Sequence, residues 1–141
     1  MARIKLDIPK KFHFSTRIKV RITDMNYGNH LGNDSLLSLM HQARVEFLQH
    51  LGYTEMNLEG AGLIMADVAV QYKNEAFAGD ELLFEMTAYD FSVTSFDLFY
   101  FITRVTDKKV IALAKTNMVC FDYQQRKMMD VPESFKKYFE N

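Results

Sequence analysis

The chain has 141 residues, in which 17 Lys and Arg residues nearly balance 18 Asp and Glu residues, so the formal net charge is −1. This balance disfavours a protein that binds nucleic acid or another polyanion. Hydrophobic residues make up 48% of the chain and aromatic residues 13%, which excludes a disordered segment and fits one folded domain over residues 1–141. A domain of this length buries enough surface to be stable without disulfides or a structural metal.

The cysteine content and the N-terminal segment bear on the compartment. Cys120 is the single cysteine, so no intramolecular disulfide can form, and no Cys/His cluster has the spacing of a zinc site. Residues 1–11 lack the apolar run of a signal sequence, and nowhere do about 18 apolar residues follow one another. We therefore expect a cytoplasmic protein that binds no metal and does not enter a membrane.

The hydrophobic pattern predicts one long helix among antiparallel strands. Strict alternation over residues 17–22 predicts a strand over residues 12–23. Apolar residues spaced by three and four predict a helix over residues 34–51, with Asn33 or Asp34 as its N-cap and Gly52 as a left-handed C-terminal cap. We expect four further strands with short connections, over residues 62–73, 82–91, 95–105 and 110–122. A short final helix is expected to begin at Pro132.

The apolar surface of the predicted long helix extends partly around it, because Leu39 and Val45 lie outside the main stripe. A flat contact would leave them exposed. We therefore predict an α+β fold in which a curved antiparallel sheet of about five strands wraps round the helix. Phe99 and Phe101 suggest that the outer face of the sheet is also partly covered. Pairing with a second copy would protect the open sheet edges, so we expect a homodimer or a homotetramer.

The loop between the first strand and the long helix, residues 24–34, holds the densest set of small and polar groups. The first turn of a helix has backbone N–H groups without partners and a partial positive charge, which stabilise a carbonyl oxygen that gains negative charge. Asp24 could act there as general base or nucleophile, and His30 as a second donor or base. These groups suit acyl transfer or hydrolysis. Asp24 could equally cap a turn, and Asn26 and Asn33 are common turn formers.

Four segments together resemble the hotdog-fold acyl-CoA thioesterases, and most closely the branch related to 4-hydroxybenzoyl-CoA thioesterase. They are residues 24–33, 42–48, 78–82 and 95–100, and the similarity spans residues 12–132. The resemblance implies a sheet of five or six antiparallel strands round one helix, assembled as a dimer or tetramer. It also implies hydrolysis of an acyl-CoA thioester, or of an acyl-carrier-protein thioester, without a cofactor.

The family's loop commonly has the form Asp-x-Asp-x-x-Gly-His-x-Asn-Asn. Its first aspartate, its histidine and its last asparagine correspond to Asp24, His30 and Asn33. The second aspartate, which is the catalytic carboxylate of well-described members, corresponds to Asn26, and an amide cannot act as a general base. Either Asp24 takes over, or His30 activates water with Asn26 as an orienting group, or hydrolysis is weak or absent.

Further residues are candidates for binding the substrate. Gly32, Asn33 and Asp34 are expected beside the thioester at the start of the helix, and Tyr27 could line the acyl pocket or cover the core. Glu46 could reach the acyl group bound by a partner chain, as a helix carboxylate does in some hotdog thioesterases, or form an ordinary ion pair or face water.

Two other functions compete with hydrolysis. The asparagine at position 26 favours a non-catalytic hotdog module that binds acyl-CoA or a protein partner. A dehydratase of the same fold is a third possibility, but the chain lacks the His-Phe-Pro type of segment that this chemistry uses.

Overall fold

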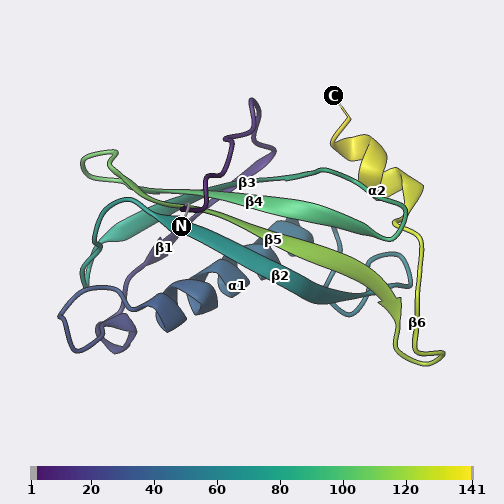
Figure 1. Cartoon of the computed structure of the whole chain (residues 1–141), viewed down its shortest axis with the longest axis horizontal. Coiled ribbons are helices and arrows are strands. Elements are labelled where there is room, and N and C mark those ends of the chain that lie inside the picture. The colour runs from purple at the N-terminus through teal and green to yellow at the C-terminus, as the bar shows by residue number, and fades with distance from the viewer. Residues whose placement is uncertain (1–2, 141) are drawn as a thin grey trace.

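Five long strands form an antiparallel sheet in the order β1-β3-β4-β5-β2, and a two-residue strand, β6, pairs with β5 (Figure 1). The computed structural model describes residues 3–140. The strands are β1 (Phe14–Lys19), β2 (Gly62–Tyr72), β3 (Glu81–Tyr89), β4 (Ser95–Arg104), β5 (Val110–Asp122) and β6 (Lys127–Met128). The helices are α1 (Asn33–His50), α2 (Glu133–Tyr138) and the short 3-10 helix η1 (Ile22–Asp24). The predicted α+β architecture is confirmed.

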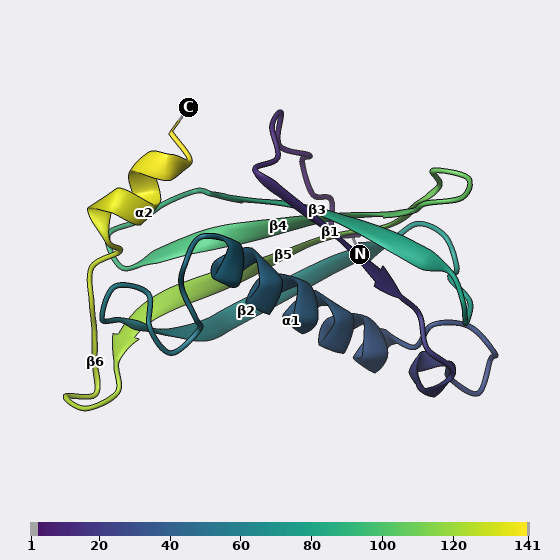
Figure 2. The ribbon, with the colours of Figure 1, turned by 180° about the vertical axis from the view of Figure 1, so that it is seen from behind.

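Helix α1 lies against one face of the sheet, behind it in Figure 1 and in front of it in Figure 2. The helix and the facing side chains of the sheet form the core. Alternate residues of β4 point to the helix and are fully buried: Phe96, Leu98, Tyr100 and Ile102. From α1 the buried side chains include Leu36, Leu39, Met40, Ala43 and Phe47. The sheet therefore covers a wide sector of the helix, as the sequence predicted.

The outer face of the sheet is also covered in part. Phe99 of β4 is 0% exposed, and its ring lies 6.4 Å from that of Phe12, which also stacks on Phe101 at 5.7 Å. The N-terminal segment crosses this side of the molecule, where the Leu6 N–H donates to Oε1 of Gln71. The expected partial covering of this face is confirmed.

The predicted element ends hold with two corrections. Strand β1 ends at Lys19 because Asp24 turns the chain into η1, accepting a hydrogen bond from the Arg21 N–H at 2.7 Å. The prediction that Asn33 or Asp34 caps α1 is wrong: Gly32 is the N-cap, and no side chain of residues 3–140 caps the helix.

The other predicted helix ends agree with the structure. Gly52 follows α1 with φ +87°, as the predicted left-handed cap requires, and Pro132 is the N-cap of α2. Within residues 3–140 no helix is both long enough and apolar enough to span a membrane.

Candidate active site

Asp24 is buried at the start of the loop, and one arginine binds both of its carboxylate oxygens. Arg21 donates from Nη2 to Oδ1 at 2.9 Å and from Nε to Oδ2 at 3.1 Å. Burial by itself raises the pKa of Asp24, but the hydrogen bonds from Arg21 outweigh it, so the pKa lies below its usual value. The carboxylate is therefore ionised at neutral pH, and its oxygens already have partners.

Asn26 shapes the loop that follows. Its side-chain Oδ1 accepts hydrogen bonds from the N–H groups of Gly28 at 2.9 Å and His30 at 3.4 Å. Its backbone N–H donates to the carbonyl oxygen of His30 at 2.9 Å. The asparagine thus closes a tight turn that positions the imidazole. A side chain at position 28 would come within 3.2 Å of His30 Nε2, so Gly28 leaves room for the ring.

The start of α1 has unused hydrogen-bond donors. The Leu36 N–H is the first to bond within the helix, to the carbonyl oxygen of Gly32 at 2.9 Å. The N–H groups of Asn33, Asp34 and Ser35 have no acceptor among residues 3–140. These amides and the aligned peptide dipoles of an 18-residue helix form a site for a negatively charged oxygen.

A pocket of about 260 Å³ lies at this helix end. His30, Leu31, Asn33 and Leu36 form one side, and residues 72–76 with Ile111 form the other. His30 Nδ1 lies 3.1 Å from the carbonyl oxygen of Leu31. Because a carbonyl only accepts hydrogen bonds, Nδ1 of the neutral ring carries the proton and Nε2 is free to accept one.

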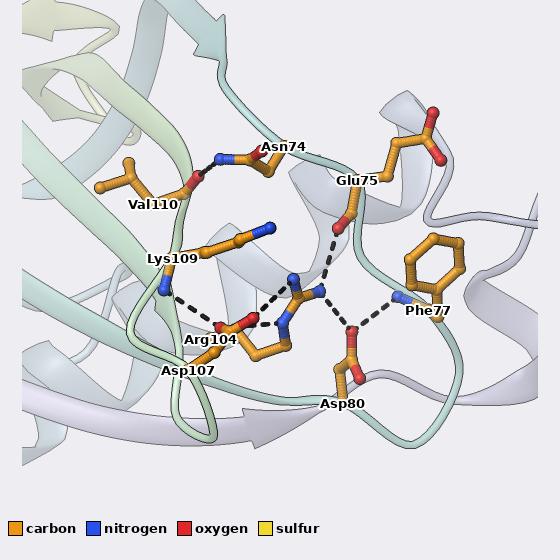
Figure 3. A network of polar contacts seen from close by, with 8 residues as sticks. All are labelled: Asn74, Glu75, Phe77, Asp80, Arg104, Asp107, Lys109 and Val110. Atoms are coloured by element: carbon orange, nitrogen blue, oxygen red, sulfur yellow. Dashed lines mark hydrogen bonds and ion pairs between the residues drawn. The ribbon is translucent and has the colours of Figure 1, made fainter.

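A network centred on Arg104 fixes the wall of this pocket opposite α1 (Figure 3). Arg104 Nη1 donates to the carbonyl oxygen of Glu75 at 3.1 Å and to Oδ2 of Asp80 at 3.0 Å. Its Nε and Nη2 bond both carboxylate oxygens of Asp107. Nearby, the Asn74 side chain donates to the carbonyl oxygen of Val110 at 2.7 Å. Figure 3 shows the Glu75 carboxylate pointing away from the arginine while its carbonyl faces it.

The structure brings together some of the predicted site residues and separates others. His30 and Asn33 line the pocket, and Asn33 is the first residue of α1 after its N-cap Gly32. Asp34 is exposed in the first turn of the helix, and its Oδ1 lies close to Gly32. Six predicted site residues are outside the pocket lining: Asp24, Asn26, Tyr27, Gly32, Asp34 and Glu46.

Tyr27 and Glu46 lie away from the pocket, one in solvent and the other farther along α1. The Tyr27 side chain is fully exposed and neither lines the pocket nor covers the core of this chain. Glu46 is about 20 Å along the axis from Asn33, at 1.5 Å per residue. Its carboxylate accepts hydrogen bonds from the side chains of Thr16 and Gln42.

Sequence reasoning missed the far wall of the pocket and Arg104. Tyr72 and Lys73 end a predicted strand and Glu75 follows it, but only the fold shows that this strand end meets the start of α1. No local pattern marks Arg104, because its partners lie in two different connections. Among the described residues, no group of three His, Cys, Asp or Glu side chains could hold a metal ion.

Residues 20–139 match the thioesterase-like superfamily. The chain belongs to this superfamily. The resemblance found in the sequence is thereby confirmed at the superfamily level. A comparison with curated proteins gave no significant match.

Several solved thioesterase structures share the fold. A 1,4-dihydroxy-2-naphthoyl-CoA thioesterase from Synechocystis has a TM-score of 0.79 and 20% identity, over 89% of this chain and 94% of that one. A probable thioesterase from Escherichia coli has a TM-score of 0.78 and 22% identity, over 91% and 97% of the two chains. A DHNA-CoA thioesterase from Staphylococcus aureus has a TM-score of 0.76 and 17% identity, over 89% and 85%. The fold is therefore that of the hotdog thioesterases.

Proposed function

We propose that the protein hydrolyses an acyl-CoA thioester whose carbonyl oxygen binds at the start of α1. The observation that carries this proposal is the pocket of about 260 Å³ beside three unpaired helix amides, lined by His30 and Asn33. Such an arrangement stabilises the oxyanion that forms when water attacks a thioester. Membership in the thioesterase-like superfamily supports the same reaction. The solved relatives named for 1,4-dihydroxy-2-naphthoyl-CoA favour an aromatic acyl group as the first substrate to test.

His30 is the general base in this proposal. The hydrogen bond from its Nδ1 to Leu31 leaves Nε2 as the acceptor for a proton from water. The water oxygen bonds to the thioester carbon, Nε2 takes the proton, and the negative charge moves to the carbonyl oxygen. When the C–S bond breaks, the CoA sulfur leaves with the bonding electron pair and receives the proton from the imidazolium. The acyl group leaves as a carboxylic acid.

Two carboxylates remain alternatives to His30 as the base. Glu75 is the one carboxylate among the described residues that line the pocket. Asp24 was predicted from the sequence and stays a prediction, although its contacts with Arg21 favour a structural role. Asn26 acts in this proposal by positioning His30 through the loop.

The test measures CoA release from short-chain, medium-chain and aromatic acyl-CoAs with the purified protein and the variants His30→Gln, Glu75→Gln and Asp24→Asn. We expect His30→Gln to lower kcat by roughly two orders of magnitude, as loss of a general base does. Glu75→Gln and Asp24→Asn should lower kcat by less than tenfold. Full activity of His30→Gln would remove the proposed base, and no turnover of any thioester would overturn the hydrolase.

A non-catalytic acyl-CoA-binding module is the second candidate. The asparagine at position 26 and the arginine that binds both oxygens of Asp24 favour it, because neither residue then supplies a free carboxylate. Saturable binding of a CoA thioester without release of CoA would establish this function instead.

We also propose that two copies pair along β2. This strand is an edge of the sheet, and it exposes several large apolar side chains: Ile64, Met65, Val68 and Tyr72. Unpaired edge groups beside apolar side chains favour a second strand as the covering element. Val68→Asp should lower the mass measured by light scattering to that of a monomer, whereas Val93→Asp, at a 72% exposed position outside the sheet, should not. The cytoplasmic location expected from the sequence stays a prediction.

A further inference from the structure

Arg44 is a charged residue on the buried side of α1. It lies four residues after Met40 and three before Phe47, both of which are fully buried, and it is itself only 7% exposed. Burial of a guanidinium costs free energy unless hydrogen bonds and an opposite charge compensate. Each N–H donor of Arg44 therefore needs an acceptor.

The protein satisfies only part of the guanidinium. Nε donates to Oε2 of Glu55 at 2.9 Å, and Nη1 donates to the hydroxyl of Tyr100 at 3.0 Å. The Tyr100 hydroxyl also contacts Oγ1 of Thr116 at 2.9 Å, and Nε2 of His41 lies 2.6 Å from Oε1 of Glu55. An arginine has five N–H donors. Three of those of Arg44, including both on Nη2, have no acceptor among residues 3–140.

Arg44 lines a second pocket, of about 200 Å³, which we call the Arg44 pocket. Its walls are mainly apolar, from Leu37, Met40, Met65 and Val68. Its polar groups come from Ser38, His41, Arg44 and Thr116. A mainly apolar pocket with a few convergent polar groups is the usual form of a small-molecule site.

The Arg44 pocket follows the candidate active site along the same two elements. Helix α1 contributes Leu36 to the first pocket and Leu37 to the second. Strand β2 contributes Tyr72 to the first and Val68 to the second. Arg44 lies about 16 Å from Asn33 along the helix axis, at 1.5 Å per residue. An acyl group that reaches the guanidinium from a thioester at Asn33 must cover about this distance between α1 and β2.

We propose that the Arg44 pocket binds the distal end of the acyl group and selects substrates that carry a neutral oxygen there, such as a hydroxyl or a keto group. This inference rests on the proposed function only for the position of the thioester. Free N–H donors call for an acceptor, while Glu55 already balances the charge of Arg44, so a second carboxylate is disfavoured. A plain hydrocarbon end would displace water from these donors without replacing its hydrogen bonds.

The test uses CoA thioethers, which cannot be hydrolysed, so that binding is measured apart from turnover. Calorimetry compares S-alkyl-CoA with the ω-hydroxyalkyl and ω-carboxyalkyl analogues in the octyl, decyl and dodecyl series. We expect the hydroxyl form to bind about tenfold more tightly than the plain chain at one of these lengths, as a hydrogen bond to a charged group allows. No preference at any length, or a preference for the carboxylate, would overturn the proposal.

Variants connect the preference to the arginine. Arg44→Lys and Arg44→Met should reduce the preference to less than twofold, whereas Arg17→Met, at an exposed arginine on β1, should retain it. An unchanged preference in Arg44→Lys would overturn the proposal, and thermal unfolding checks that each variant is folded. If Arg44→Met does not fold, the wild-type comparison and Arg44→Lys still decide.

Hydrolysis of the matched thioesters is measured in parallel. Loss of turnover with a retained hydroxyl preference would refute the hydrolase alone. Turnover without the preference would refute the Arg44 pocket alone.

Discussion

The backbone N–H of Leu31 donates to the carbonyl oxygen of Ala76 at 2.8 Å. This bond joins the loop before α1 to the connection between β2 and β3, two segments far apart in the sequence. Both residues are buried, and both line the pocket at the start of the helix. The shape of the proposed thioester site therefore depends on whatever fixes the 73–80 connection.

Arg104 binds this connection through Glu75 and Asp80, alongside the backbone hydrogen bonds from Lys73 and Asn74 to Ile111. We predict that Arg104→Gln raises KM for acyl-CoA severalfold and lowers the free energy of unfolding by about 1–2 kcal/mol. The reason is that the charge-assisted hydrogen bonds of the guanidinium to Glu75, Asp80 and Asp107 are lost. Steady-state kinetics and urea unfolding measure the two effects. Arg17→Gln, which removes an exposed ion pair with Glu81, is the matched control and should change neither by much. An unchanged KM in Arg104→Gln would show that the wall keeps its position without the network.

Lys73 is the cation among the residues that line the pocket, and its side chain forms no ion pair with the described part of the chain. We predict that Lys73→Gln raises KM two- to fivefold without changing kcat, because the lysine attracts the phosphates of CoA, and that the effect shrinks at high salt as exposed charges are screened. Kinetics at two ionic strengths measure this. Lys127→Gln, at β6 and the other end of the sheet, provides the comparison (Figure 1). If both variants keep the wild-type KM, Lys73 does not contribute to CoA binding.

The fold could be predicted because its signals are local and periodic. Alternation marked the strands, the spacing of Leu36, Met40, Ala43 and Phe47 marked α1, and Gly52 marked its end. The N-cap was misassigned for a tertiary reason. The N–H of Gly32 bonds to the carbonyl oxygen of Asp24, which sets the backbone of the cap without any side chain.

The site could be predicted only on one side. The loop and the helix start are contiguous in sequence, so His30 and Asn33 could be identified as neighbours of the free amides. Glu75 and Lys73 lie more than 40 positions later and meet the loop only through strand pairing. Arg44 did carry a signal in its spacing from Met40 and Phe47, which places a charge on the buried stripe of the helix.

Glu55 links the Arg44 network to pH. Burial raises the pKa of Glu55, but hydrogen bonds from Arg44 and His41 outweigh this, so its pKa lies below the ordinary value of 4.5. A carboxyl with a lowered pKa stabilises the fold fully above pH 4.5, and this stabilisation is lost as the pH falls through the lowered pKa. We predict that Glu55→Gln is less stable at pH 7 and that its free energy of unfolding falls less steeply below pH 4.5 than that of the wild type. Urea unfolding across this range measures the slope. The control Glu133→Gln, at an exposed glutamate, should keep the wild-type slope. A wild-type slope in Glu55→Gln would show that the ion pair has no effect on stability.

Cys120 allows a last prediction, which also bears on how hydrolysis is measured. The thiol is fully buried on β5, and burial raises its pKa to about 11. Thiolate is the reactive form, so at pH 8 only about one thiol in a thousand would be ionised even with solvent access. We predict that the native protein reacts with the disulfide reagent DTNB at least a hundredfold more slowly than the protein unfolded in guanidinium chloride, where one thiol per chain should react. Free CoA can then be titrated by DTNB during turnover without interference, and Cys120→Ala should give the same rate of CoA release. Rapid labelling of the native protein would instead mean that β5 opens, because the thiol is fully buried while the strand is paired with β2 and β4.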